Sequence, residues 1–495
     1  MNYLNSKIFK RILYITIASI SIFLLFFVAY KASVTSFIHD ESFTYLNYVH
    51  LKFIHILSFK NSNINNHILN SILIKYSEIL FGTSELTLRL PNILALFVYL
   101  VFTFLILKRY KLILLLPLFI FMTFNPFLLD FFGLTRGYGL SIGLMITSLY
   151  FLISYFEDKE KNSKLIAFNL SALLAALANF TLLNFYVAGL VTFNAIILLD
   201  YIFNKEGRKI KFNLLKKNKV NIISVFISTI VLFEPVRRLA KISVSSYGGG
   251  SLIDTFSSQV YNTFYNIGIS KNHCFFLTYS IIFILIANLT IITINIARQN
   301  EQFIKQFKGL IISNLIIVII LLEIIVQHFL FNYDYFKDRF ALFLYPLVVL
   351  NFSYLIYYIL TTRIKYIAIA FCFLSILPFS KNLYNNLNLK SYKDWRYDMN
   401  TKKMLAELDN HLKETNYNKT QIQLGINWLF EPTINFYRTT KNMEWLKPVD
   451  REGLKKDDDF NYLFDDELKF NEEIIFTGEM TNSSRKTILI KVNKK

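Results

Sequence analysis

The most constraining feature of this chain is a series of long apolar runs with few or no charged residues. The first run, 12–30, has 19 residues without a charge and follows Lys7, Lys10 and Arg11. About 20 apolar residues in a helix cross the ~30 Å hydrocarbon core of a bilayer. The apolar part of a signal peptide is shorter, about 7 to 15 residues. We therefore expect an uncleaved membrane-spanning helix.

Ten further runs of this kind follow the first. Hydrophobic residues make up 54% of the 495 residues, and charged residues only 18%, against roughly 25% in soluble domains. The sequence thus predicts a mainly α-helical, polytopic membrane protein of about eleven transmembrane helices within residues 1–380. The later runs lie near 88–107, 112–129, 137–156, 164–178, 184–203, 220–234, 274–296, 309–330, 340–360 and 364–380.

The net charge of +19 reflects membrane topology. Residues 1–380 hold 33 of the 53 basic residues and 16 of the 34 acidic residues. If the spans alternate, one set of loops carries 21 Lys and Arg in about 55 residues and the other carries 12 in about 120, which orients the first set toward the cytoplasm. We expect no nucleic-acid partner. We expect a bacterial inner-membrane protein with a cytoplasmic N-terminus and with loop 31–87, loop 235–273 and the tail 381–495 on the outer face.

Composition changes after Ser380. The last 115 residues contain 38 charged ones and short apolar stretches at 422–427 and 487–492. This pattern predicts a small soluble α/β domain, on the outer face by the orientation above.

An acid pair, Asp40 and Glu41, lies directly beyond the first span. A carboxylate there can accept a proton from an attacking hydroxyl, or can hold a divalent cation against a phosphate, and a low local dielectric would raise its pKa. The alternative is structural: the acids begin an amphipathic helix and complement its dipole. The pattern leaves both interpretations open.

The same loop contains a second helix signal. Apolar residues recur at three- and four-residue spacing from Ile68 to Leu80, which predicts a helix lying on the membrane. His67 precedes it, where a neutral imidazole can donate to phosphate or bind a metal, or where it is a capping residue.

The order of these pieces resembles a known superfamily. An acid pair after the first span, an amphipathic segment, then FG-x-SE-x-x-x-RLP (81–91) before the second span is similar to the GT-C membrane glycosyltransferases, and to family 39 in particular, which includes protein O-mannosyltransferases and aminoarabinose transferases. Where that family has prolines this chain has NNHILN (65–70), which leaves the substrate subclass open. Residues 127–152, with Arg136 and Tyr138, and 335–350, with Arg339, Tyr345 and Pro346, resemble two further family segments.

The resemblance implies transfer of a sugar from a polyprenyl-phosphate donor to a lipid, glycan or protein acceptor at the outer face, usually with inversion. Membrane lipids surround such an enzyme. The resemblance and the residue chemistry together suggest a site with Asp40 as general base, Glu41 supporting it or sharing a divalent metal cation with it, and a substrate- and phosphate-binding set of His67, Arg89, Arg136, Tyr138 and Arg339, with Asp130 as a possible second acid.

Two other classes fit part of the pattern. A transporter or flippase of lipid-linked saccharides would show two halves of similar hydropathy with paired interrupted helices. An O-antigen polymerase or ligase would concentrate its basic residues in a large later loop, for which 235–273 is the candidate. Here the polar residues gather in the first loop and the tail, which favours the glycosyltransferase.

Overall fold

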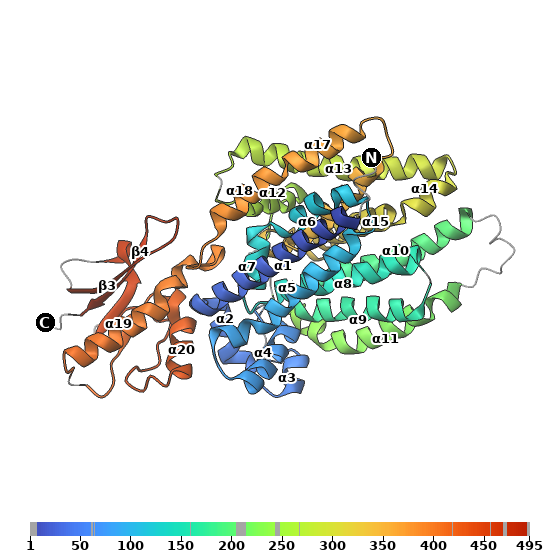
Figure 1. Cartoon of the computed structure of the whole chain (residues 1–495). Coiled ribbons are helices and arrows are strands. Elements are labelled where there is room, and N and C mark those ends of the chain that lie inside the picture. Colours follow the sequence, from blue (N-terminus) through green and yellow to red (C-terminus); the bar gives the residue numbers. More distant parts are fainter. Residues whose placement is uncertain are drawn as a thin grey trace.

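The computed structural model of the protein describes residues 7–60, 63, 65–158, 160–203, 214–242, 248–266, 268–417, 419–455, 457–468 and 473–492. Helices dominate it, which confirms the predicted fold class. They form an elongated bundle, and the C-terminal domain projects from one end of it (Figure 1). We call this end of the bundle the domain end and the opposite end the far end.

All eleven predicted apolar runs are helical. Within the described residues, eight helices are long and apolar enough to cross a membrane, and a bent pair makes a ninth. The array makes the chain an integral multi-pass membrane protein. The eight are α1 (Lys7–Val34), α5 (Glu85–Leu107), α8 (Gly137–Glu157), α10 (Leu182–Phe203), α11 (Leu214–Leu239), α13 (Lys271–Ala297), α15 (Lys308–Phe331) and the consecutive α17 (Lys365–Leu374) and α18 (Ile376–Asn386).

Three predicted runs differ from straight full-length spans. Runs 164–178 and 340–360 form shorter helices, α9 (Asn162–Ala178) and α16 (Leu344–Ile359). Run 112–129 begins with the turn η3 (Leu112–Leu114) and bends by 67° between α6 (Leu115–Thr123) and α7 (Pro126–Phe132). Asn125 accepts a hydrogen bond from the Leu128 N–H at 3.1 Å, and Pro126 follows it at the first helical position. This is a standard helix start, so a new helix begins inside the apolar run.

Short helices from the first loop cover the domain end. They are α2 (His39–Thr44), the π-helical turn η2 (Tyr45–Val49), α3 (Phe53–Leu57) and α4 (Ile68–Phe81), and α4 confirms the helix predicted after His67. Two later elements also matter for the site: α12 (Leu252–Thr263) and the 3₁₀ turn η5 (Asp338–Ala341). The short α14 (Glu301–Gln306) lies at the far end.

The C-terminal domain is a small α/β unit, as predicted. Its four-stranded sheet has the order β1-β2-β4-β3, with β1 parallel to β2 and the other neighbours antiparallel. Its elements are η6 (Lys393–Asn400), α19 (Thr401–Glu414), β1 (Leu424–Ile426), η7 (Trp428–Phe430), α20 (Glu431–Thr440), β2 (Phe460–Phe464), η8 (Asp465–Glu467), β3 (Glu473–Glu479) and β4 (Lys486–Lys491).

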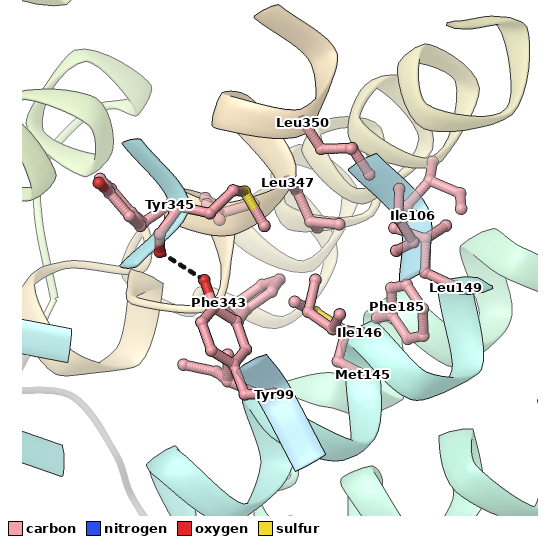
Figure 2. Packing of buried hydrophobic residues seen from close by; sticks show 14 of the residues in the cluster. Tyr99, Ile106, Met145, Ile146, Leu149, Phe185, Phe343, Tyr345, Leu347 and Leu350 are labelled. Atoms are coloured by element: carbon pink, nitrogen blue, oxygen red, sulfur yellow. Dashed lines mark hydrogen bonds between the residues drawn. The ribbon is translucent and has the colours of Figure 1, made fainter. Parts of the chain in front are cut away.

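The two largest of four apolar clusters in the described part of the chain hold most of these parts. The large core fills the bundle, where Tyr99, Met145 and Leu347 interdigitate and the Tyr99 hydroxyl donates to the Met122 carbonyl at 2.6 Å (Figure 2). The second core belongs to the C-terminal domain but also contains Phe37 and other residues of the first loop. The C-terminal domain therefore packs on the first loop through a shared core.

The ring stack of Phe37 on Phe436, with centroids 4.2 Å apart, is central to that shared core, and Phe436 is 2% exposed. We expect Phe436→Ala to destabilise the docked domain by about 3–5 kcal/mol, the usual cost of emptying a buried phenylalanine site. Thermal unfolding in detergent measures the loss. Ile474→Ala, at a half-exposed position, is the control, and equal melting temperatures for both variants would contradict the shared core.

Candidate active site

The two adjacent acids of the first loop point to different surroundings. Successive residues of a helix lie about 100° apart around its axis, so Glu41 faces the bundle when Asp40 does not. Glu41 is fully buried and pairs with Arg89, Oε2 to Nη2 at 2.5 Å and Oε1 to Nε at 2.9 Å. Its oxygens also accept the N–H groups of Thr135 at 2.6 Å and Ile38 at 3.1 Å. Glu41 is thus committed to structure.

Arg89 is equally committed. Its remaining N–H groups donate to the backbone carbonyls of Ala32, Thr35 and Ser36 at 2.8, 3.1 and 2.9 Å. The Glu41–Arg89 pair therefore supports the site and does not line it. The sequence had suggested a catalytic role for Glu41 and phosphate binding for Arg89.

Asp40, in contrast, faces two arginines. Its carboxylate lies 3.4 Å from Arg136 Nη2 and 3.7 Å from Arg339 Nη1. Burial by itself raises the pKa of Asp40, but the two guanidinium groups outweigh burial and hold that pKa below its usual value. The sequence predicted a raised pKa for Asp40, and this prediction was wrong. The sequence could not show how close the two guanidinium groups lie to the Asp40 carboxylate.

Each arginine is fixed by its own element. Arg136 is the N-cap residue of α8, is 2% exposed, and donates to the Asn65 carbonyl at 3.2 Å. Arg339 follows Asp338, whose backbone has φ +49° in the left-handed region. That turn is tied to α12: the Asp338 N–H donates to Ser258 Oγ at 3.0 Å, and its carboxylate accepts from Asn262 at 2.9 Å.

His67 and Tyr138 complete the cluster. The rings of His67 and Tyr138 meet edge to face with centroids 5.0 Å apart. His67 Nδ1 lies 2.9 Å from the Ala178 carbonyl oxygen, and because a carbonyl only accepts, Nδ1 carries the proton. A side chain at Gly137 would meet this carbonyl at 1.8 Å, so the close approach needs glycine.

The protonation state of His67 decides what it can bind. Burial and the charge of Arg136 hold the pKa of His67 well below its usual value, so the ring is neutral. With the proton on Nδ1, the other nitrogen Nε2 is a hydrogen-bond acceptor. It suits a hydroxyl group, whereas the sequence suggested that this histidine donates to phosphate.

Three polar atoms of the cluster lack hydrogen-bond partners among the described residues although they are buried: Asp40 Oδ2, His67 Nε2 and Arg136 Nε. Buried polar atoms are nearly always hydrogen-bonded. They come from two positions in the first loop and from the N-cap of α8, and their convergence around one ion cluster suits a polar ligand.

A two-carboxylate metal site does not fit these residues. Glu41 is held by Arg89, and a cation beside Asp40 would be repelled by Arg136 and Arg339. Among the residues described, no group of three or more His, Cys, Asp or Glu side chains is arranged to hold a metal. The divalent metal cation that the sequence suggested for Asp40 and Glu41 therefore does not fit this site.

Asp130 lies in a different pair. Its carboxylate accepts from Lys31 Nζ at 2.8 Å, with both side chains at least nine-tenths buried, and from the Lys393 N–H at 3.2 Å. These bonds join α7 to α1 and to the start of the C-terminal domain. Asp130, suggested as a second acid, is therefore held in a buried structural ion pair with Lys31.

The sequence reasoning missed a segment of the C-terminal domain, η6. The Arg339 guanidinium lies over the ring of Trp395, with its Cζ atom 5.3 Å from the ring centroid. Burial raises the pKa of the neighbouring Asp394 above its usual value. Residues 391–400 contain three aromatic and four charged residues directly after the last span, and that density was the available signal.

Comparisons with known proteins gave structural similarities only. No protein-family model matches the chain, and no curated protein matches its sequence. It is similar to ArnT from Cupriavidus metallidurans bound to undecaprenyl phosphate, with 10% identity, TM-score 0.47, and coverage of 96% of this chain and 97% of that one. It is also similar to the oligosaccharyltransferase AglB from Archaeoglobus fulgidus, with 10% identity, TM-score 0.36, and coverage of 90% and 69%.

Arg89→Met should destabilise the protein by about 3–5 kcal/mol, because it leaves the Glu41 carboxylate buried without its partner. The double variant Glu41→Gln/Arg89→Met should recover part of this loss, since no unpaired charge remains. Thermal unfolding in detergent of the wild type, the two single variants Arg89→Met and Glu41→Gln, and the double variant measures both effects. If the double variant is less stable than Arg89→Met by as much as Glu41→Gln is less stable than the wild type, the two side chains do not interact and the pair is contradicted.

Proposed function

We propose that this protein is a membrane glycosyltransferase that moves a sugar from a polyprenyl-phosphate donor to an acceptor, with Asp40 as the general base. The observation that carries the proposal is the convergence of Asp40, Arg136, Arg339 and His67, among which three buried polar atoms have no hydrogen bond to the described residues. The donor class comes from the resemblance of the first loop to the GT-C superfamily. Lipid, glycan and protein acceptors all fit this proposal.

The proposed orientation has the site outside the cytoplasm. Asp40 lies at the domain end of the bundle, whereas Lys108, Arg109 and Lys111 follow the opposite end of α5. Basic loops favour the cytoplasmic side. Lipid-linked donors presented on the outer leaflet would then reach the site from the membrane.

Each residue has a role that its chemistry permits. Arg136 and Arg339 bind the donor phosphate, since guanidinium groups bind phosphate through paired, charge-assisted hydrogen bonds. They stabilise the charge that develops on this phosphate as the sugar leaves. Asp40 takes the proton of the acceptor hydroxyl while the oxygen of that hydroxyl attacks the anomeric carbon. His67 Nε2 accepts a hydrogen bond from a sugar hydroxyl.

An inverting displacement requires these groups to separate. The base and the leaving phosphate then lie on opposite sides of the anomeric carbon, as in inverting glycosidases, whose carboxyl groups are about 6.5–9.5 Å apart. In the structure Asp40 lies 3.4 Å from Arg136 and 3.7 Å from Arg339. Donor binding therefore draws the arginines to the phosphate and frees the carboxylate.

The flippase alternative makes a different prediction for the same residues. A transporter moves the lipid-linked sugar without breaking the glycosidic bond, so it needs no general base. Asp40 would then serve only as a counter-ion to the arginines.

Asp40→Asn should lower sugar transfer by about 10²- to 10⁴-fold, the usual contribution of a general base, without loss of protein. The measurement is mass spectrometry of envelope glycans and lipids from a strain lacking this gene that expresses each variant. The control is Asp200→Asn, which removes a carboxylate paired with Lys308 in another ion pair. Wild-type transfer by Asp40→Asn at normal abundance would remove Asp40 as the base and favour the counter-ion role.

Arg339→Gln should weaken binding of undecaprenyl phosphate, used as a probe of the donor site, by about 10- to 100-fold through loss of a charged hydrogen bond. It should also move the acidic limb of the pH–activity profile to higher pH. Arg339 helps to lower the pKa of Asp40, and without it the effect of burial, which raises that pKa, gains weight.

Calorimetry or native mass spectrometry gives the lipid affinity, and transfer rates between pH 4 and 8 give the limb. Arg363→Gln, in the turn after α16, is a control expected to change neither. Unchanged affinity together with an unchanged acidic limb would separate Arg339 from the site.

A further inference from the structure

The helix that carries Asp40 is held from both sides. The residue after Asp40 is Glu41, which the membrane bundle binds through Arg89 and the Thr135 N–H. The residue before it is His39, which the C-terminal domain binds. The His39 N–H donates to Asp398 Oδ2 at 2.6 Å, and His39 Nδ1 donates to the Leu429 carbonyl at 2.7 Å.

The helix α2 needs these external bonds. It has six residues, and a helix this short does not hold its shape in isolation. The N–H groups of its first turn have no partner within the helix and must be satisfied elsewhere. The contact from Asp398 to His39 supplies one partner, at the first residue of the helix.

Asp398 is fully buried, and the Thr401 hydroxyl donates to its Oδ1 at 3.5 Å. Burial raises the pKa of Asp398 well above the usual value. This residue belongs to η6, the same segment whose Trp395 stacks on Arg339. One segment of the C-terminal domain thus contacts both the helix of the proposed base and one of the proposed phosphate ligands.

We propose that Asp398 is a positioning residue for Asp40, so that the C-terminal domain takes part in the transfer step itself. This inference rests on the proposed function of Asp40. It assigns to the bond between Asp398 and His39 the task of setting where the Asp40 carboxylate stands relative to Arg136 and Arg339.

The test compares four variants of the full-length protein. Asp398→Ala removes the acceptor of the His39 N–H, and Asp398→Asn keeps an amide oxygen in its place. His39→Ala removes the bond to Leu429 and the edge-to-face contact with Trp428, keeps the N–H that Asp398 accepts, and leaves no buried gap at 398. Lys402→Ala is the matched control, because Lys402 pairs with Glu85 at 2.6 Å across the same junction without contact to α2.

Three readouts distinguish positioning from general stability: the transfer rate in cells, the affinity for undecaprenyl phosphate, and hydrogen exchange of the peptide covering 36–45. Asp398→Ala should lower transfer by about 10- to 100-fold, since a shift of about 1 Å in a reacting group has this effect. Its lipid affinity should change less than about 2-fold, and exchange in 36–45 should accelerate. Asp398→Asn should restore most of the transfer rate and most of the slow exchange in 36–45. For His39→Ala, both values should lie between those of the wild type and those of Asp398→Ala.

The outcomes separate this inference from the proposed function. Normal transfer and normal exchange in Asp398→Ala would overturn the inference. Equal losses in Asp398→Ala and Lys402→Ala would also overturn it, because weaker docking alone would then explain them. If Asp398→Ala does not fold, His39→Pro decides by the same criteria, because it removes the N–H that Asp398 accepts at a first helical position, where proline is tolerated. Active Asp40→Asn would instead overturn the proposed function, and exchange in 36–45 would still test whether Asp398 holds α2.

Discussion

The buried pair of Glu41 and Arg89 is the interaction on which the candidate site depends. Removing two charges from water costs several kcal/mol per ion, and good geometry with further hydrogen bonds must offset that cost. Here both groups have a full set of partners. These partners join the end of α1, the turn before α2, the start of α5 and the segment before α8 at one point.

This geometry explains why the reactive groups meet. Asp40 is the neighbour of Glu41 in sequence, and Arg136 is the neighbour of Thr135, whose N–H the Glu41 carboxylate accepts. The ion pair therefore fixes the backbone on each side of the Asp40–Arg136 contact. Arg339 and Trp395 arrive independently, the first held by α12 and the second by the C-terminal domain.

Local sequence patterns predicted the parts of the molecule that depend on local physics. Uncharged runs gave the membrane helices, and the spacing of apolar residues gave α4. Even so, the break at Asn125–Pro126 shortened one predicted span, because cap chemistry prevailed over hydropathy there. The position of Arg136 and Arg339 before apolar runs was also visible in the sequence.

The roles within the acid pair could not be predicted, because Asp40 and Glu41 are equivalent in the sequence until tertiary contacts distinguish them. Arg89, 48 residues away, selects Glu41, and the helical geometry then leaves Asp40 facing the other way. The role of Asp130 is likewise decided by a distant partner, Lys31, which is 99 residues away in the sequence. The change of composition after Ser380 places segment 391–400 in a separate domain. Composition does not reveal that this segment folds back onto the membrane bundle.

The charges of the site give an order of events under the proposed function. Asp40 is one negative charge between two guanidinium groups, and His67 is neutral. The two guanidinium groups favour an anionic donor phosphate over an uncharged acceptor. While the arginines lie against Asp40, its low pKa makes it a weak base. Once phosphate engages them, burial is the larger influence and the basicity of Asp40 rises. Donor binding thus prepares the carboxylate for the acceptor, and an acceptor that arrives first meets a base that is not yet able to act.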